Sequence, residues 1–144
     1  MKAIILAAGN ATRLLPLTKY TPQSLLKIKD KTILEMQTET LNKSGINDIV
    51  VVTGYLADKI DKFLKGKNIK PFFNPFYSIS GMLMSLWVIK EELRDGFIML
   101  YSDILFEESI AKLLLNDKHD ICLAIKRDDI REEAEKAYEE NNII

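Results

Sequence analysis

The chain has 144 residues, which is enough for one domain with a hydrophobic core of ordinary size. Twenty basic residues against twenty-one acidic residues leave a net charge of −1, so no strong global field attracts nucleic acid or an anionic membrane. No apolar run approaches the ~20 residues of a membrane-spanning helix, no cleavable signal is recognisable, and the single cysteine, Cys122, cannot form an internal disulfide. We therefore expect a cytoplasmic protein that binds neither nucleic acid nor membranes, with Cys122 in its core.

Predicted strands and helices alternate along the chain. Apolar runs predict five strands: Ala3–Ala7, Asp48–Thr53, Ile69–Phe73, Phe97–Tyr101 and Asp120–Ile125. Most of these runs are continuous, rich in Ile and Val and bounded by turn residues, which is typical of strands covered on both faces. Segments with helical periodicity separate or follow them: Ile33–Lys43, Leu56–Leu64, Gly81–Leu93, Glu107–Leu115 and Asp129–Glu140. Such alternation predicts an α/β fold with a doubly wound, mainly parallel sheet, in a single domain over residues 1–144.

The first predicted strand leads into a loop suited to phosphate. It ends at Ala8 and Gly9, and a polar stretch that contains Arg13 follows. Exposed backbone N–H groups after a buried strand, next to a cation, can hold a phosphate group. The alternatives are that Arg13 is a surface arginine paired with a helix acid and that Gly9 is an ordinary turn residue.

Asp103 comes just after the fourth predicted strand. The apolar run Phe97–Tyr101 places it at the carboxyl end of a central strand. Ligands of open α/β sheets bind at that edge, so Asp103 is a candidate ligand-binding residue. The alternative is that Asp103 only caps the helix predicted to begin at Glu107.

Residues 1–35 resemble the start of the sugar-phosphate nucleotidyltransferase family. The matching residues, at the family's spacings, are Leu6-Ala7-Ala8-Gly9, Thr12-Arg13-Leu14, Pro16-Leu17-Thr18, Pro22, Leu25-Leu26, Ile28, Lys31 and Leu34-Glu35. The resemblance implies a Rossmann-like nucleotide-diphospho-sugar transferase fold. It also implies transfer of a nucleoside monophosphate from a nucleoside triphosphate to a small phosphorylated acceptor, with release of pyrophosphate.

The resemblance assigns roles to residues of this chain. The nucleotide would bind along the first loop, at Leu6, Ala7, Ala8, Gly9, Asn10 and Ala11. Arg13 would pair with the β- and γ-phosphate oxygens, and Asp103 matches the strand-end aspartate that holds Mg²⁺ against the phosphates. Mg²⁺ is therefore the expected cofactor, and Arg13, Gln23 and Asp103 are the expected catalytic residues.

Two positions depart from the family pattern. Ala11 replaces a glycine, and we expect Gly9 and Asn10 to take the unusual dihedral angles that the loop needs. Gln23 replaces a lysine that contacts the phosphates; its amide can donate a hydrogen bond but brings no charge. Losing one such positioned donor costs about a hundredfold to a thousandfold in rate. Two alternatives therefore stay open: an active enzyme, or a nucleotide-binding or assembly module that has lost catalysis. Whether Gln23 is natural or engineered also stays open.

The segment 74–86 resembles cytidylyltransferases that act on phosphocholine and similar phosphorylated alcohols or phosphonates. The resemblance implies nucleotide contacts by Asn74, Ser80, Gly81 and Ser85 and favours CTP as the donor. The match is partial, because Gly81-Met82 stand where the family has an asparagine pair. The alternative is a turn followed by an amphipathic helix.

The expected partners are a nucleoside triphosphate and a small phosphorylated acceptor such as a sugar phosphate or phosphocholine. Related domains continue beyond this length with strands that help to cover the acceptor. We therefore expect the chain to lack part of the acceptor-binding C-terminal half. Exposed edges of a shortened sheet favour a homodimer.

Overall fold

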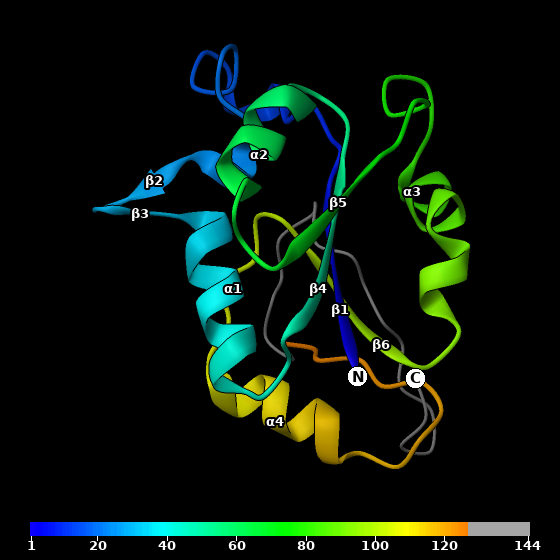
Figure 1. The fold of residues 1–144 in the computed structure, drawn as a ribbon. Helices are drawn as coiled ribbons and strands as arrows, with labels where there is room; N and C mark the ends of the chain where they lie inside the picture. Colours follow the sequence, from blue (N-terminus) through cyan, green and yellow to red (C-terminus); the bar gives the residue numbers. More distant parts are fainter. Residues whose placement is uncertain (127–144) are drawn as a thin grey trace.

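The computed structural model of the protein describes residues 1–126. Its centre is a parallel sheet of four strands in the order β5-β4-β1-β6 (Figure 1). The strands are β1 (Lys2–Ala7), β4 (Asp48–Thr53), β5 (Ile69–Phe73) and β6 (Phe97–Tyr101). In the register, Ile5 of β1 lies opposite Val51 of β4 on one side and Leu100 of β6 on the other. The predicted parallel sheet is confirmed.

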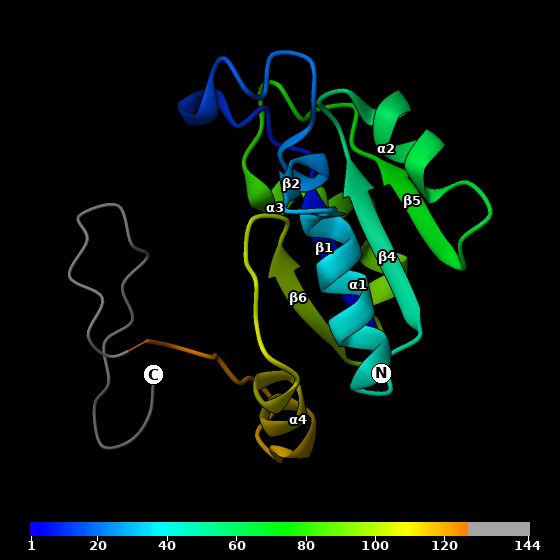
Figure 2. The ribbon, with the colours of Figure 1, turned by 90° about the vertical axis from the view of Figure 1, so that its left-hand side faces the viewer.

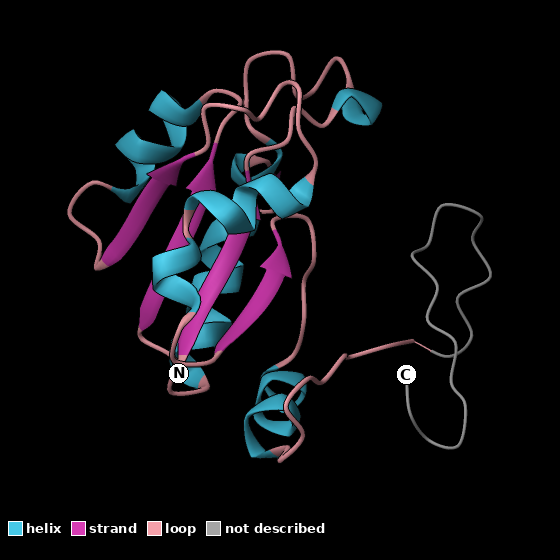
Figure 3. Cartoon of the chain, turned by 90° about the vertical axis from the view of Figure 1, so that its right-hand side faces the viewer, coloured by secondary structure: helices cyan, strands magenta, loops and turns pink. Residues whose placement is uncertain are grey.

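Both faces of the central strands β1 and β4 are covered, whereas no residue of the edge strand β5 is fully buried. The helices are α1 (Ile33–Lys43), α2 (Ala57–Leu64), α3 (Met82–Val88) and α4 (Glu108–Asn116), and a small antiparallel pair is formed by β2 (Lys27–Ile28) and β3 (Lys31–Thr32). Neighbouring side chains of a strand point to opposite faces. Ile5 accordingly joins the buried cluster with α1 and α2 (Figure 2), and Ile4 joins the cluster on the α3 side (Figure 3). None of the described helices has both the length and the apolar character needed to cross a membrane.

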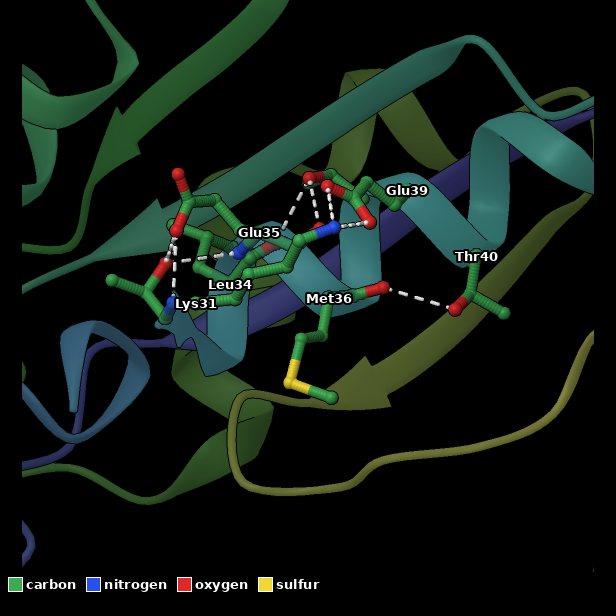
Figure 4. A network of polar contacts seen from close by, with 8 residues as sticks. Lys31, Leu34, Glu35, Met36, Glu39 and Thr40 are labelled. Carbon is green, nitrogen blue, oxygen red and sulfur yellow. Dashed lines mark hydrogen bonds and ion pairs between the residues drawn. The ribbon is translucent and has the colours of Figure 1, made fainter. Parts of the chain in front are cut away.

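Helix α1 begins with a capping box. The Thr32 hydroxyl accepts a hydrogen bond from the backbone N–H of Glu35 at 3.1 Å, and the Glu35 carboxylate accepts one from the backbone N–H of Thr32 at 2.8 Å. Nearby, Lys31 pairs with Glu39 at 2.6 Å (Figure 4). The cap satisfies backbone donors that have no partner inside the helix, so it fixes where α1 starts.

Three predicted elements differ from the structure or lie outside it. The predicted helix Gly81–Leu93 breaks at Ile89 (φ −110°, ψ 17°), whose side chain is buried against the sheet, and continues as a 3-10 turn. The predicted strand Asp120–Ile125 is wrong: the segment is irregular, and Ile121 is 84% exposed. A strand needs a hydrogen-bonded neighbour, and nothing in residues 1–126 pairs with it. Cys122 is consequently not a core residue, and the helix Asp129–Glu140 lies outside the described residues.

Candidate functional site

A cavity of about 310 Å³ opens at the carboxyl edge of the sheet. Three segments line it: the loop after β1, the turn after β6, and the segment that leads from β5 into α3, with Gln23 contributed by a separate loop. The predicted site residues that line this cavity are Leu6, Ala8, Gly9, Asn10, Ala11, Arg13, Gln23, Asn74, Ser80, Gly81, Ser85 and Asp103. Ala7, by contrast, is buried in the core cluster on the α1 side.

The loop after β1 contains a strained residue. Ala11 takes the left-handed conformation (φ 46°, ψ 48°), whereas Gly9 and Asn10 do not have positive φ. The expectation that Gly9 and Asn10 supply the unusual dihedral angles is therefore wrong. Two hydrogen bonds to the Ala11 carbonyl oxygen hold the turn: one from the fully buried Thr18 hydroxyl at 2.9 Å and one from the Leu14 N–H at 3.0 Å. The turn is over-determined by its surroundings, which is how such strain persists.

Gln23 and Asp103 meet across the cavity. The Gln23 amide Nε2 donates a hydrogen bond to Asp103 Oδ2 at 3.1 Å, although the two residues are 80 positions apart. Gln23 opens a short 3-10 turn, Gln23–Leu25, and Asp103 follows β6. The neutral Gln23 amide thus donates to the Asp103 carboxylate, whereas the family pattern has a positively charged lysine at position 23.

Two charged residues belong to the described lining of the cavity, the positively charged Arg13 and the negatively charged Asp103. A nucleoside triphosphate carries several negative charges, so a single guanidinium would leave most of that charge uncompensated. The exposed Asp103 carboxylate is a hard oxygen donor, and Mg²⁺ needs only one or two protein carboxylates when phosphates and waters complete its octahedron. The donor set therefore fits a magnesium–phosphate complex.

Asn74 and Ser85 stabilise the opposite wall. Asn74 is 1% exposed; its Nδ2 donates to Ser85 Oγ at 3.0 Å, and its Oδ1 accepts from the Phe76 N–H at 2.9 Å. The Ser80 hydroxyl donates to the Phe76 carbonyl oxygen at 2.6 Å. These side chains join the turn after β5 to the start of α3, so they shape the wall as well as line it.

Sequence reasoning missed Gly54, which follows β4. A Cβ atom there would lie 2.5 Å from Tyr77 Cβ and 2.6 Å from the Ala8 carbonyl oxygen, so no larger residue fits without displacement. Both neighbours line the cavity, as do Thr12, Met82, Tyr101 and Ser102, which the sequence did not single out. A glycine directly after an apolar strand was the available signal, but it does not reveal a contact with Tyr77, 23 positions later.

A second group of potential metal ligands lies after α4. Donor atoms of Asp117, His119 and Cys122 lie within 4.8 Å of one another. The Cys122 thiol and the His119 backbone N–H and ring donate hydrogen bonds to Asp117, and they hold the pKa of its carboxyl well below the usual range. These hydrogen bonds account for the cluster, and none of the three residues lines the cavity.

Comparisons with known proteins identify the family of the chain. The family model described as nucleotidyl transferase matches residues 2–125. The choline-phosphate cytidylyltransferase of Streptococcus pneumoniae is 39% identical over 107 residues, which are 74% of this chain and 47% of that protein. The CTP:phosphoglutamine cytidylyltransferase of Campylobacter jejuni is 34% identical over 134 residues, which are 88% of this chain and 53% of that protein.

A solved structure is similar as well. The CTP:phosphocholine cytidylyltransferase from Streptococcus pneumoniae superposes with a TM-score of 0.68 at 37% identity, over 75% of this chain and 49% of that one. The chain thus spans about half the length of these relatives. The match of the family model, the parallel sheet and the cavity at its carboxyl edge lead to one conclusion: the chain belongs to the nucleotidyl transferase family.

Proposed function

We propose that this chain transfers a nucleoside monophosphate from a nucleoside triphosphate to a small phosphorylated or phosphonate acceptor, releasing pyrophosphate. The observation that carries the proposal is the single cavity in which the loop after β1, Arg13 and Asp103 meet. Backbone N–H groups, a guanidinium and a carboxylate are the groups that binding and activating a triphosphate require.

The chemistry follows from positioning and electrostatics. An oxygen of the acceptor attacks the α-phosphorus, and the bond to the pyrophosphate oxygen breaks. The Arg13 guanidinium pairs with oxygens of the leaving phosphates, and loop N–H groups from Ala8 to Ala11 donate to them. Asp103 would hold Mg²⁺, which supplies further stabilisation of phosphate charge when bound. No covalent nucleophile is needed.

Cytosine is the favoured base of the nucleotide. The support is that the two curated relatives cited above, 39% and 34% identical to this chain, are named as cytidylyltransferases. Sugar phosphates and phosphocholine are the acceptor classes proposed for this chain. Mg²⁺ dependence, a cytoplasmic location and a homodimer stay predictions.

A second candidate is a nucleotide-binding or assembly module that has lost catalysis. Its support is Gln23, which places a neutral amide rather than a cation on Asp103. The enzyme and a nucleotide-binding module both require nucleotide binding, whereas an assembly module does not, so binding is the first property to test.

The test is calorimetric titration of the protein with CTP, UTP, dTTP, ATP and GTP, each with and without Mg²⁺. We expect magnesium-dependent binding with CTP preferred. Preference for another nucleotide would overturn the base assignment and leave the reaction class standing. No binding of any of the five would overturn the enzyme and the nucleotide-binding module and would leave the assembly module.

A further inference from the structure

Helix α1 carries a buried glutamine that reaches the turn of Asp103. Gln37 is 1% exposed, and its Nε2 donates hydrogen bonds to the carbonyl oxygens of Tyr101 at 2.8 Å and Ile104 at 2.7 Å. These two carbonyl groups flank Ser102 and Asp103 in the sequence. The amide nitrogen therefore bridges both ends of the turn that presents the carboxylate.

Packing alone does not explain a glutamine at this place. Its Oε1 is buried and finds no hydrogen-bond partner among the described residues. An unsatisfied buried acceptor costs stability, and an apolar side chain of similar size avoids that cost. The neighbouring core positions of the same helix, Leu34 and Leu41, are indeed apolar.

Other hydrogen bonds also restrain the turn, and one of them is the bond from Gln23 Nε2 to Asp103 Oδ2 at 3.1 Å. The Ser102 N–H donates to the Leu6 carbonyl oxygen at 3.1 Å, which ties the turn to β1. The Ile104 N–H reaches the Tyr101 carbonyl oxygen at 3.4 Å, a long hydrogen bond. Gln37 makes the shorter contacts to both ends, so the geometry of Asp103 depends strongly on it.

We infer that Gln37 is a positioning residue for Asp103: it holds the turn after β6 in the shape that points the carboxylate into the cavity. The inference rests on the proposed function, in which Asp103 holds the cation. Outer hydrogen-bond partners of metal ligands typically change metal affinity by about tenfold to a hundredfold when they are lost.

The test compares Gln37→Met with a matched control on the same helix. Methionine keeps the length of the side chain and removes both donors. Thr38→Val is the control, because Thr38 is also buried and its hydroxyl donates to two carbonyl groups of its own helix, those of Leu34 and Glu35. Gln37→Leu serves as the second variant if Gln37→Met does not fold.

The readouts are Mn²⁺ affinity in the presence of CTP, measured by electron paramagnetic resonance, and hydrogen exchange of the amides of residues 102–104. We expect Gln37→Met to weaken Mn²⁺ binding about tenfold or more and to speed exchange at the turn, with Thr38→Val unchanged. Asp103→Asn separates the role of Gln37 from the proposed role of Asp103 in holding the cation. If Asp103→Asn loses Mn²⁺ while a folded Gln37 variant keeps it, the role of Gln37 is overturned. If Asp103→Asn itself keeps Mn²⁺, the proposed role of Asp103 fails, and that of Gln37 with it.

Discussion

At the scale of single residues, Ala11 shows how the loop after β1 differs from its family pattern. A left-handed conformation costs an L-residue with a Cβ about 1–2 kcal/mol, and glycine does not pay this steric cost. We expect Ala11→Gly to raise the free energy of unfolding by about 1 kcal/mol at most, because the greater backbone entropy of glycine offsets part of the relief. Urea unfolding of the parent and of Ala11→Gly measures this change in the free energy of unfolding.

Gly9→Ala is the matched control for Ala11→Gly. Gly9 lies in the same loop, does not have positive φ, and has open space where a Cβ would be. An alanine there should therefore be tolerated. If Gly9→Ala and Ala11→Gly change stability in the same direction and by the same amount, backbone strain at Ala11 is not the cause.

Gln23 is the residue that separates an active enzyme from a binding module. A lysine at this position would add a cation beside Asp103 and the phosphates, where the cavity lining described above has one arginine. If the site is otherwise complete, we expect Gln23→Lys to raise turnover about a hundredfold. Initial rates of pyrophosphate release at saturating CTP, Mg²⁺ and phosphocholine measure it.

Gln23→Met is the control, because it removes the amide without adding charge. It should lower turnover or leave it unchanged. An unchanged rate for Gln23→Lys, with CTP still bound, would show that the charge at this position does not limit the reaction. If the parent and Gln23→Lys both bind CTP but release no pyrophosphate, the binding module is favoured.

At the scale of elements, the capping box of α1 makes stability depend on pH. The Thr32 backbone N–H, followed by the Thr32 hydroxyl, lowers the pKa of Glu35 below its usual value. A depressed carboxyl pKa stabilises the fold above the unfolded-state pKa, near 4.5, and this contribution is lost as the pH falls through the folded-state pKa. We expect Glu35→Gln to be less stable than the parent at pH 7 and the difference to shrink toward pH 3.

Urea unfolding at both pH values tests this expectation. Thr32→Ala should destabilise the protein by about 1 kcal/mol, since it removes the N-cap hydroxyl. Glu39→Gln is the control: its ion pair with Lys31 lies on the surface, where such pairs contribute little (Figure 4). A difference between Glu35→Gln and the parent that stays constant with pH would contradict the role of the cap.

Sequence patterns predicted elements well where local signals suffice. The run Ala3–Ala7 predicted β1, and the helical periodicity of Ile33–Lys43 predicted α1, because apolar periodicity is a local property. The strand at Asp120–Ile125 was wrong, since strand formation depends on a neighbour that no local pattern reveals.

The residues of the candidate site likewise divide into those that the sequence predicted and those that it did not. Arg13 and Asp103 were found because each follows a predicted strand. Gln37 was not found, because its contact with Tyr101 spans 64 positions. Gly54 was missed for a similar reason: the side chain that excludes a Cβ there belongs to Tyr77.

At the scale of the whole molecule, strand order explains where the cavity lies. From β1 the chain moves to β4 and then to β5 on one side, whereas β6 is added on the other side of β1. The strand order therefore reverses its direction between the neighbouring strands β1 and β6. Open α/β sheets bind ligands at such a switch point, outside the carboxyl ends of the strands. The loop with Arg13 and the turn with Asp103 leave these two strands, so a nucleotide bound in the cavity as proposed would bridge them.

A ligand that bridges two central strands should stabilise the entire fold, because the contacts exist only when β1 and β6 are paired. Binding to the folded state alone raises the free energy of unfolding by about 2.7 kcal/mol when the ligand is at a hundred times its Kd. We expect CTP with Mg²⁺ to give this increase and EDTA to remove most of it, since the described lining opposes the triphosphate with Arg13 alone. Thermal unfolding monitored by circular dichroism measures it. Cytidine is the control, because it carries the base without phosphates; stabilisation by cytidine equal to that by CTP would place the binding energy in the base and contradict the phosphate site.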